Sequence, residues 1–392
     1  MLPQLLYLGD VPVESSYHGS TLLYRLLQRY PPDRLKIIEG NLFPPRTGRR
    51  LAGVSYATLD VGRTRVLNSR VHDWYSWWLL KGATTRVAQV PRLLAGFAPA
   101  AVLTVGHGFS WMTAARLAGN AGLPLHMIVH DDWPRAVTPP LQARVDRVFG
   151  EVYRQAASRL CTSPFMVDEY ERRYGARGTV LLPYRAVDAP AFSGVAERLS
   201  GSARRLVCAF AGTINSPGYA TLLRQLAQAT SSHDGEVLIF GPITEAQADA
   251  AGLALSNVRL GGLLKSDELL SRLRSEADIL FVPMSFAPED RANMQMGFPS
   301  KLTDYTAVGL PLLICGPPYC SAVRWAHDNP GVAEVVASDD AAALAAAIER
   351  LSRDSRHRVR LALKAQEIGS RDFSPVTADA IFRSALDAGA RQ

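Results

Sequence analysis

The sequence from position 297 to 311 reads Gly297-Phe298-Pro299-Ser300-Lys301-Leu302-Thr303-Asp304-Tyr305-Thr306-Ala307-Val308-Gly309-Leu310-Pro311. Short apolar runs flank it, at residues 279–284 and 312–315, and such runs are typical of strands buried on both faces. Ser300 is a favoured N-cap residue, whereas Gly309 and Pro311 are residues that end helices. We therefore predict a strand, a helix of about two turns and a second strand, which is the repeating unit of a parallel α/β sheet.

The polar residues of this predicted helix share one face, because residues three and four apart on a helix are neighbours. Lys301, Asp304 and Tyr305 are predicted to project together, beside Ser300. An ammonium group at a helix N-terminus suits a diphosphate, and a carboxylate one turn later can accept hydrogen bonds from two ribose hydroxyls. The spacing predicts a nucleoside diphosphate site at the carboxyl edge of the sheet. The alternatives are a surface ion pair for Lys301 with Asp304 and core packing for Tyr305.

The chain has 392 residues, which is a natural length for two domains. Its apolar fraction of 47% is typical of a globular protein, and no apolar run approaches the roughly 20 residues of a membrane-spanning helix. The first residues lack a basic leader and a cleavage site, and the four cysteines show no metal-ligand spacing. These features predict a cytoplasmic protein without a metal site.

Short apolar runs alternate with helical patterns along the whole sequence, which predicts two doubly wound α/β domains with parallel sheets. We expect an N-terminal domain over residues 1–185, a linker rich in Ala, Ser, Pro and Gly over 186–204, and a C-terminal domain over 205–371. A last helix within 372–392 is predicted to pack back on the N-terminal domain. The predicted strands are Leu5–Gly9, Lys36–Glu39, Ala101–Val105, His126–His130, Arg159–Thr162, Val180–Pro183, Leu206–Ala211, Val237–Phe240, Val258–Leu260, Ile279–Val282, Leu312–Cys315 and Val335–Val336.

Four segments of the second half carry a resemblance to a known family: Gly212-Thr213 after an apolar run, Phe240-Gly241-Pro242, Val258-Arg259-Leu260-Gly261-Gly262, and Asp304 to Pro311. Their order is similar to that of the GT-B glycosyltransferases, specifically the large retaining family of group 1 glycosyl transferases. The resemblance extends over nearly the whole chain and implies two Rossmann-like domains that face a cleft. The family has two Glu residues separated by seven others in the last segment. Here Asp304 stands in the place of the second, and Met296 replaces the first.

The resemblance also implies roles for individual residues of the second domain. Gly212 and Thr213 would lie close to the donor phosphates, and Lys301 would neutralise the diphosphate. Gly262, Leu263 and Leu264 would hold the nucleotide base through their backbone groups.

The first domain resembles the same family less closely than the second domain does. Gly19 precedes a predicted helix, Thr21–Tyr30, and the resemblance implies that donor phosphate or acceptor approaches the backbone there. His107 and His130 are each predicted to end a strand, and the resemblance implies that His130 faces the donor sugar. Asp131 or Asp132 either caps the next segment or acts as a general base that deprotonates an acceptor hydroxyl. The candidate catalytic residues are His130, Asp131 and Lys301, and His107 is a candidate acceptor contact.

Three tryptophans, Trp74, Trp77 and Trp78, share one face of a predicted helix. They lie in the basic half of a chain whose net charge is +7. Burial against the core is the default interpretation of such a face. The alternative is an interfacial helix with its aromatic side in lipid and its basic neighbours on anionic headgroups. Nucleic acid is not an expected partner, because the sequence contains no recognised binding module.

Together these features predict a glycosyltransferase that moves a sugar from a nucleoside diphosphate sugar to a hydroxyl of a glycan or lipid-linked acceptor, in surface polysaccharide or glycoconjugate biosynthesis. No cofactor is expected besides this co-substrate, and no metal, since no acidic D-x-D pair is present to hold one at the phosphates. The expected location is the cytoplasm or the inner face of the membrane. Two other functions stay open: a nucleotide-sugar 2-epimerase, which shares this fold, and a non-catalytic partner subunit, which the missing first Glu suggests.

Overall fold

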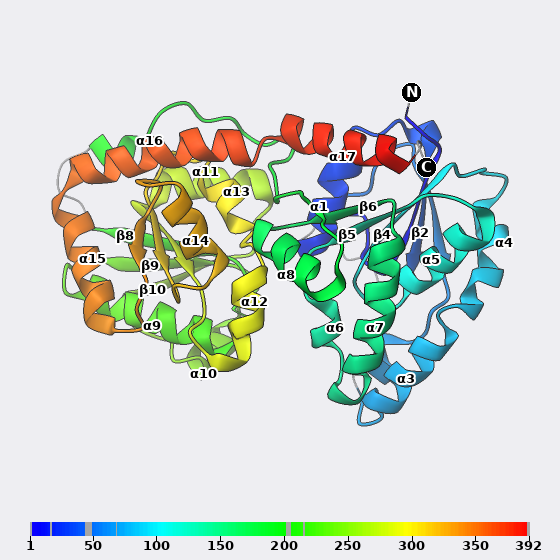
Figure 1. Cartoon of the computed structure of the whole chain (residues 1–392). Coiled ribbons are helices and arrows are strands. Elements are labelled where there is room, and N and C mark those ends of the chain that lie inside the picture. The colour runs from blue at the N-terminus through cyan, green and yellow to red at the C-terminus, as the bar shows by residue number, and fades with distance from the viewer. Residues whose placement is uncertain are drawn as a thin grey trace. The chain divides into compact units, whose positions relative to one another are not determined.

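The computed structural model describes residues 2–15, 18–43, 49–67, 69–200, 205–214 and 216–389. The chain divides into two compact units (Figure 1). Unit 1 consists of Met1–Pro183 together with Pro375–Gln392, and unit 2 consists of Tyr184–Ser374. Residues 186–204, predicted as a linker, therefore belong to unit 2, and the last helix belongs to unit 1. Each unit has a parallel sheet with helices on it, which confirms the predicted α/β class.

Unit 1 is built on a seven-stranded parallel sheet in the order β3-β2-β1-β4-β5-β6-β7. The order reverses between β1 and β4, so loops that leave these two strands diverge and leave room at the carboxyl edge of the sheet. The strands are β1 (Leu5–Gly9), β2 (Leu35–Gly40), β3 (Ser55–Leu59), β4 (Ala101–Val105), β5 (Leu125–Val129), β6 (Ser158–Cys161) and β7 (Thr179–Val180).

The helices of unit 1 cover its sheet, and the carboxyl-terminal helix α17 (red in Figure 1) lies against α1, β5 and β6. Between α5, α7 and α8 the core is aromatic: the Phe149 ring lies 5.4 Å from that of Trp111 and 5.7 Å from that of Tyr170. The helices are α1 (His18–Leu27), α2 (Thr64–Leu67), α3 (His72–Gly82), α4 (Val90–Leu94), α5 (Ser110–Ala121), α6 (Trp133–Ala136), α7 (Pro139–Gln155), α8 (Pro164–Tyr174) and α17 (Pro375–Gly389), with 3₁₀ turns at Pro32–Arg34 and Thr85–Gln89.

Strand β3 is the strand of unit 1 that the sequence does not predict. It lies at the edge of the sheet, and its residues Ser55 to Thr58 are exposed or half-buried. A strand that is not buried on both faces needs no continuous apolar run, which is the pattern that marks the central strands. The sequence of β3, Ser-Tyr-Ala-Thr-Leu, therefore lacks the apolar pattern from which a strand could be predicted.

Unit 2 is built on a six-stranded parallel sheet in the order β10-β9-β8-β11-β12-β13. Its order reverses between β8 and β11, again opening the carboxyl edge. Leu226 of α9 and Ile348 of α15 are fully buried in a core they share with β9 and β11. The strands are β8 (Val207–Ala211), β9 (Glu236–Phe240), β10 (Val258–Gly262), β11 (Ile279–Pro283), β12 (Leu312–Cys315) and β13 (Glu334–Val336). The helices are α9 (Pro217–Ser231), α10 (Glu245–Ala250), α11 (Ser266–Glu276), α12 (Arg291–Met296), α13 (Lys301–Tyr305), α14 (Ser321–Asp328), α15 (Ala341–Arg353) and α16 (Ser355–Asp372), with 3₁₀ turns at Glu197–Ser200 and Pro288–Asp290.

The helix predicted between β11 and β12 is shorter than two turns. Regular α-helix covers only Lys301–Tyr305, and turns continue to Gly309, whose φ of 72° is a left-handed value that favours glycine. Ser300 itself has helical backbone angles, and its side chain caps nothing. Instead, its carbonyl oxygen accepts a hydrogen bond from the Thr303 hydroxyl at 2.7 Å. The predicted N-cap role of Ser300 is therefore wrong.

Candidate functional site

Lys301 lies at the carboxyl end of the strands of unit 2. Its Nζ is 4.3 Å from the centre of the Phe210 ring and 5.6 Å from that of Tyr219. A Cβ added to Gly212 would lie 3.5 Å from Nζ, so the ammonium group borders the backbone that leaves β8. Among the residues that the structure describes, no carboxylate forms an ion pair with Lys301, and burial lowers the pKa of this lysine from 10.5 to about 7. Among the described residues, the charged form of Lys301 therefore has no counter-ion.

Three glycines bring the loops after neighbouring strands together beside this lysine. Gly212 N donates a hydrogen bond to the Phe240 carbonyl at 2.9 Å, and Gly241 N donates to the Gly262 carbonyl at the same distance. A Cβ on Gly241 would lie only 2.2 Å from the Gly212 carbonyl oxygen. Gly212 and Gly262 were predicted as site residues. Gly241 was not, although its place directly after a buried strand was the signal.

The remaining predicted donor contacts of unit 2 differ in their surroundings. Thr213 and Leu264 are half-buried after β8 and β10, whereas Leu263 is 74% exposed, which leaves it open to contact a ligand. Ser300 is exposed beside Lys301, and Asp304 is half-buried on the same helix.

Tyr305 is buried, and it does not project with Lys301 and Asp304 as predicted. Its hydroxyl oxygen accepts a hydrogen bond from Ala211 N at 2.6 Å, and burial is the main reason that its pKa is raised above its ordinary value. The ring therefore ties α13 to the end of β8. Arg185 supports the same helix from its other end, donating to the Thr303 carbonyl and the Thr306 hydroxyl at 3.0 Å each. Tyr305 and Arg185 thus fix the backbone from which Lys301 extends.

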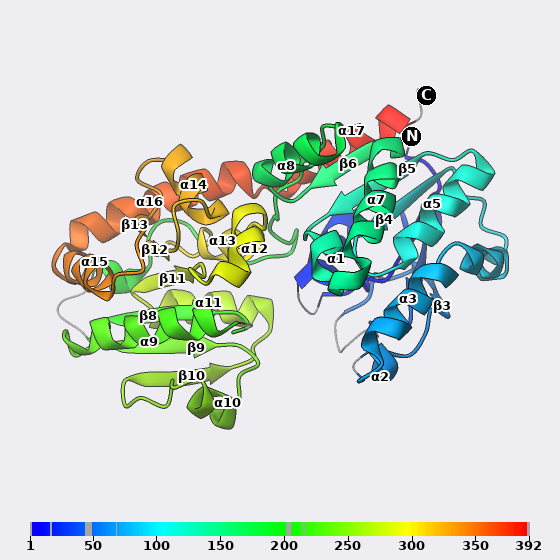
Figure 2. The same ribbon diagram turned by 60° about the horizontal axis from the view of Figure 1, so that its bottom comes forward.

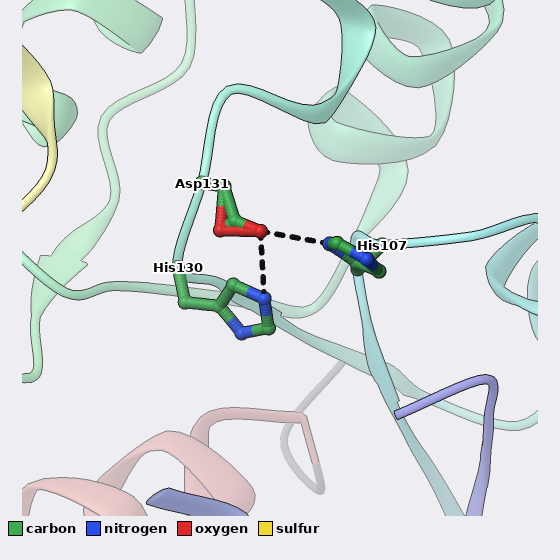
Figure 3. A group of neighbouring side chains, drawn as sticks. All are labelled: His107, His130 and Asp131. Carbon is green, nitrogen blue, oxygen red and sulfur yellow. Dashed lines mark hydrogen bonds and ion pairs between the residues drawn. The ribbon is translucent and has the colours of Figure 1, made fainter. Parts of the chain in front are cut away.

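A second cluster lies at the carboxyl ends of β4 and β5 in unit 1 (Figure 3). The Asp131 carboxylate oxygen Oδ2 is 2.7 Å from Nδ1 of His107 and 3.0 Å from Nε2 of His130. Burial by itself lowers the pKa of His130, but the charge of Asp131 outweighs it and raises the pKa above its ordinary value. Burial acts to raise the pKa of Asp131, yet the two imidazoles hold it well below its ordinary range. Asp131 is therefore a carboxylate at neutral pH.

Gly19, predicted as a phosphate or acceptor contact, lies in the first turn of α1 against this cluster. A Cβ at this position would be 2.6 Å from Cε1 of His130. Only glycine leaves room for the imidazole ring beside the helix backbone. The structure thus brings together two predicted site residues, Gly19 and His130, that are far apart in the sequence.

Histidine nitrogens and a carboxylate oxygen are also metal ligands, and these three donor groups lie within 4.8 Å of one another. Two ligands of one tetrahedral zinc ion with bonds of 2.0–2.1 Å are about 3.3 Å apart. The contact of 2.7 Å between His107 and Asp131 is shorter and has the length of a charge-assisted hydrogen bond. Hydrogen bonding therefore accounts for the cluster.

Two buried carboxylates near the cluster already accept hydrogen bonds from other parts of the protein. Asp132 receives hydrogen bonds from both terminal nitrogens of Arg173, at 2.8 and 3.0 Å. Asp10, which directly follows β1, accepts hydrogen bonds from the backbone N–H groups of Phe109 and Ser110 at the start of α5, and burial raises its pKa. Sequence reasoning missed Asp10. Its position after the first strand was the available signal.

The three tryptophans of α3 do not follow the default of core burial. Trp74, Trp77 and Trp78 are 62%, 38% and 45% exposed, whereas Leu79 and Leu80 form the buried side of the helix. Lys81 lies 4.0 Å above the Trp77 ring. Figure 2 shows α3 next to α2, which carries the exposed Arg65. We call Trp74, Trp77 and Trp78 the tryptophan patch.

In the part of the chain that the structure describes, no helix combines the length and the apolar character needed to cross a bilayer.

The sequence matches two family models in succession: a glycosyl transferase 4-like domain over residues 23–185 and glycosyl transferases group 1 over residues 205–354. No curated protein matches it. One similar solved structure is Anabaena HepE in complex with UDP and glucose, with a TM-score of 0.69, 15% identity and coverage of 98% of this chain and 99% of that one. Another is sucrose-phosphate synthase from Thermosynechococcus elongatus, with a TM-score of 0.68, 16% identity and coverage of 98% and 100%. A third is a UDP-forming α,α-trehalose-phosphate synthase from Burkholderia vietnamiensis, with a TM-score of 0.66, 14% identity and coverage of 100% and 99%. These likenesses confirm the predicted GT-B fold.

Proposed function

Because this chain belongs to the glycosyltransferases, with a glycosyl transferase 4-like domain followed by a group 1 domain, we propose that it transfers a sugar from a uridine diphosphate sugar to an acceptor hydroxyl. The observation that carries the donor assignment is Lys301. This half-buried lysine next to the loop after β8 has no partner carboxylate among the described residues, and burial disfavours its charged form, which a bound anion would stabilise. A diphosphate supplies that charge.

The uridine base is proposed from the similar structures. HepE is described with UDP and with UDP-glucose, and two of the Burkholderia synthases are named as UDP-forming. The exposed segment Gly262 to Leu264 after β10 is proposed to bind the base through its backbone, and Asp304 is proposed to bind the ribose through its carboxylate. The donor is bound without a metal in this proposal, since Lys301 takes the place of the cation.

Sugar transfer requires that negative charge developing on the departing diphosphate be stabilised. Lys301 is held in place before the reaction by Tyr305 and the glycine loops, so little reorganisation is needed at that moment. The same contacts explain why a cation is placed at the carboxyl edge of the sheet rather than on an open surface. The step that we propose beside Lys301 is the departure of the diphosphate from the anomeric carbon of the donor sugar.

A thermal-shift panel with UDP, GDP, ADP and TDP tests the donor assignment. We expect UDP to raise the melting temperature most, because a ligand present at 100 times its Kd stabilises the folded state by about 2.7 kcal/mol. The matched control is Lys301→Ala, for which the UDP shift should be lost. If no nucleotide shifts the melting temperature of the wild type, the proposed function is wrong.

The acceptor is proposed to be a glycan or a lipid-linked precursor of a surface polysaccharide or glycoconjugate, presented at an anionic membrane surface. The tryptophan patch supports this surface, because exposed indole rings partition into the headgroup region and Arg65, Arg70 and Lys81 are exposed close to them in the chain. Asp73 is the exposed acidic residue of the same helix, so the local charge is still positive. The cytoplasmic face of a membrane would provide such a surface.

Vesicle flotation tests the membrane proposal. The wild type should bind vesicles of phosphatidylcholine with phosphatidylglycerol at least tenfold more tightly than phosphatidylcholine alone, because each basic residue near the surface contributes about 1 kcal/mol. Replacing all three residues of the tryptophan patch with serine should abolish this binding. Leu363→Ser, which changes an exposed apolar residue of α16, should not. Equal binding of wild type and triple variant would rule out the patch as the membrane contact.

The 2-epimerase is the competing function of the same fold. Incubation of the protein with the donor alone separates the two activities, because an epimerase forms the epimeric nucleotide sugar without any acceptor. The match of both domains to glycosyltransferase models favours transfer.

A further inference from the structure

Asp290 lies in the loop after β11, directly before α12, and its side chain contacts a different helix of unit 2. Asp is a favoured N-cap residue, yet the Asp290 carboxylate makes no capping hydrogen bond to α12. Its oxygen Oδ2 instead accepts a hydrogen bond from the Ser216 hydroxyl at 2.8 Å. The same oxygen lies 3.5 Å from the position that a Cβ on Gly218 would take. The loop after β11 therefore places a carboxylate at the start of α9.

The start of α9 packs tightly against this loop. A Cβ on Gly218 would overlap Oγ of the fully buried Ser285, so only glycine fits beside the segment that leaves β11. The order of the sheet reverses between β8, which precedes α9, and β11. Open α/β sheets bind their ligands at such a reversal, outside the carboxyl ends of the strands. Asp290 thus lies at the ligand-binding edge of unit 2.

The Tyr219 ring connects this carboxylate with the lysine of the donor site. Nζ of Lys301 is 5.6 Å from the centre of the ring. Burial raises the pKa of Tyr219 to about 12, and the negative charge of Asp290 contributes to this rise. Asp290 and Lys301 therefore both lie near Tyr219, but no ion pair between them is found in the described part of the chain. The carboxylate borders the donor site without neutralising its lysine.

A carboxylate accepts hydrogen bonds, so beside a diphosphate it suits the neutral hydroxyl groups of the attached sugar. One oxygen is left for this contact, because Oδ1 of Asp290 has no hydrogen-bond partner among the residues with described positions. Position 296, where the family has its first Glu, offers no such group. Met296 is only 3% exposed, and a thioether is a weak acceptor. Asp290 is therefore suited to bind the donor sugar in this chain.

We propose that Asp290 binds hydroxyl groups of the donor sugar and restricts the donor to a neutral hexose, with Ser216 as the residue that positions its carboxylate. This inference rests on the proposed function and names the class of sugar that the donor carries. A uronic acid in the same place would bring a second carboxylate close to Asp290. Repulsion between the two like charges would lower its affinity by about tenfold or more.

Calorimetry at pH 7 on the full chain with UDP, UDP-glucose and UDP-glucuronate tests this proposal. The wild type should bind UDP-glucose about tenfold more tightly than UDP-glucuronate. Asp290→Asn should bring these two affinities within about threefold, because the amide keeps the size of the side chain and removes its charge. The same variant should weaken UDP-glucose relative to UDP by about fivefold, since hydrogen bonds to a charged acceptor are the stronger ones.

The matched control is Glu289→Gln, which removes the exposed carboxylate of the preceding residue and should leave all three affinities within about twofold of the wild type. Ser216→Ala tests the positioning role, because it removes the hydroxyl that holds Oδ2. It should weaken the preference for UDP-glucose over UDP-glucuronate, whereas Ser216→Thr, which keeps a hydroxyl, should retain the preference.

Equal binding of UDP-glucose and UDP-glucuronate by the wild type would overturn the proposal, and so would an unchanged preference in Asp290→Asn. A lower melting temperature of Asp290→Asn with unchanged ligand preference would assign Asp290 to stabilising the start of α9 and would likewise overturn it. Failure of the wild type to bind UDP would instead contradict the proposed function. The two failures are therefore distinguishable.

Discussion

Lys301→Ala is expected to lower kcat/KM for the nucleotide sugar by about 10³-fold while leaving the fold intact. Removal of a single preorganised group that stabilises a developing negative charge typically has an effect of this size. Nζ of Lys301 would lie 3.5 Å from a Cβ added to Gly212, so the ammonium group borders the loop that is proposed to approach the diphosphate. The measurement is steady-state kinetics together with circular dichroism. A variant with near-normal turnover would show that Lys301 does not contact the diphosphate.

The stability of Lys301→Met separates a binding role from a structural one. Burial lowers the pKa of Lys301 from 10.5 to about 7, so the charged form is disfavoured in the folded protein. Charging therefore costs stability below pH 10.5, and the cost is fully present below about pH 7. The methionine variant should be more stable than the wild type at pH 6, and the difference should shrink as the pH rises toward 10. A lysine whose charge stabilised the fold would instead make the methionine variant less stable than the wild type at pH 6.

The central strands of both sheets could be predicted because burial on both faces demands a continuous apolar run. The run near the start of unit 1, Leu5–Gly9, is one such strand, and it lies inside the sheet between β2 and β4. Edge strand β3 could not be predicted, since its side chains are partly exposed. The length of α13 could not be predicted either. It depends on a tertiary contact, the hydrogen bond from Ala211 N to the hydroxyl of the buried Tyr305.

Site residues that directly follow a strand could be predicted from the sequence. Site contacts that depend on how side chains pack could not. His107 and His130 each follow a strand, and β4 pairs with β5, so their meeting at one edge is a consequence of topology. The hydrogen bonds of Asp131 to both histidines depend on side-chain rotamers that no local pattern specifies. The confinement of His130 by Gly19 joins residues more than a hundred positions apart. Exposure of the tryptophan patch contradicts the burial that large aromatic residues usually favour.

The affinity for UDP-glucose is expected to be constant below about pH 7 and to fall by about 50-fold between pH 7 and pH 9. The diphosphate binds the ammonium form of Lys301, whose pKa in the free protein is about 7, so above that pH binding must first add a proton. UDP-glucose is the appropriate probe, because its diphosphate has no ionisation in this range, unlike the terminal phosphate of UDP. Calorimetry in buffers of different ionisation enthalpy should show uptake of about one proton at pH 9.

Lys301→Arg is the matched control for this pH dependence. A guanidinium group stays protonated throughout the range, so the affinity of the variant should not vary between pH 7 and pH 9, whatever its absolute value. If the wild type also binds UDP-glucose equally well at both pH values, with no proton uptake, then the ammonium group is not the diphosphate contact. Loss of pH dependence in the arginine variant alone requires that the titrating group be Lys301 itself, because every other ionisable residue is the same in the two proteins.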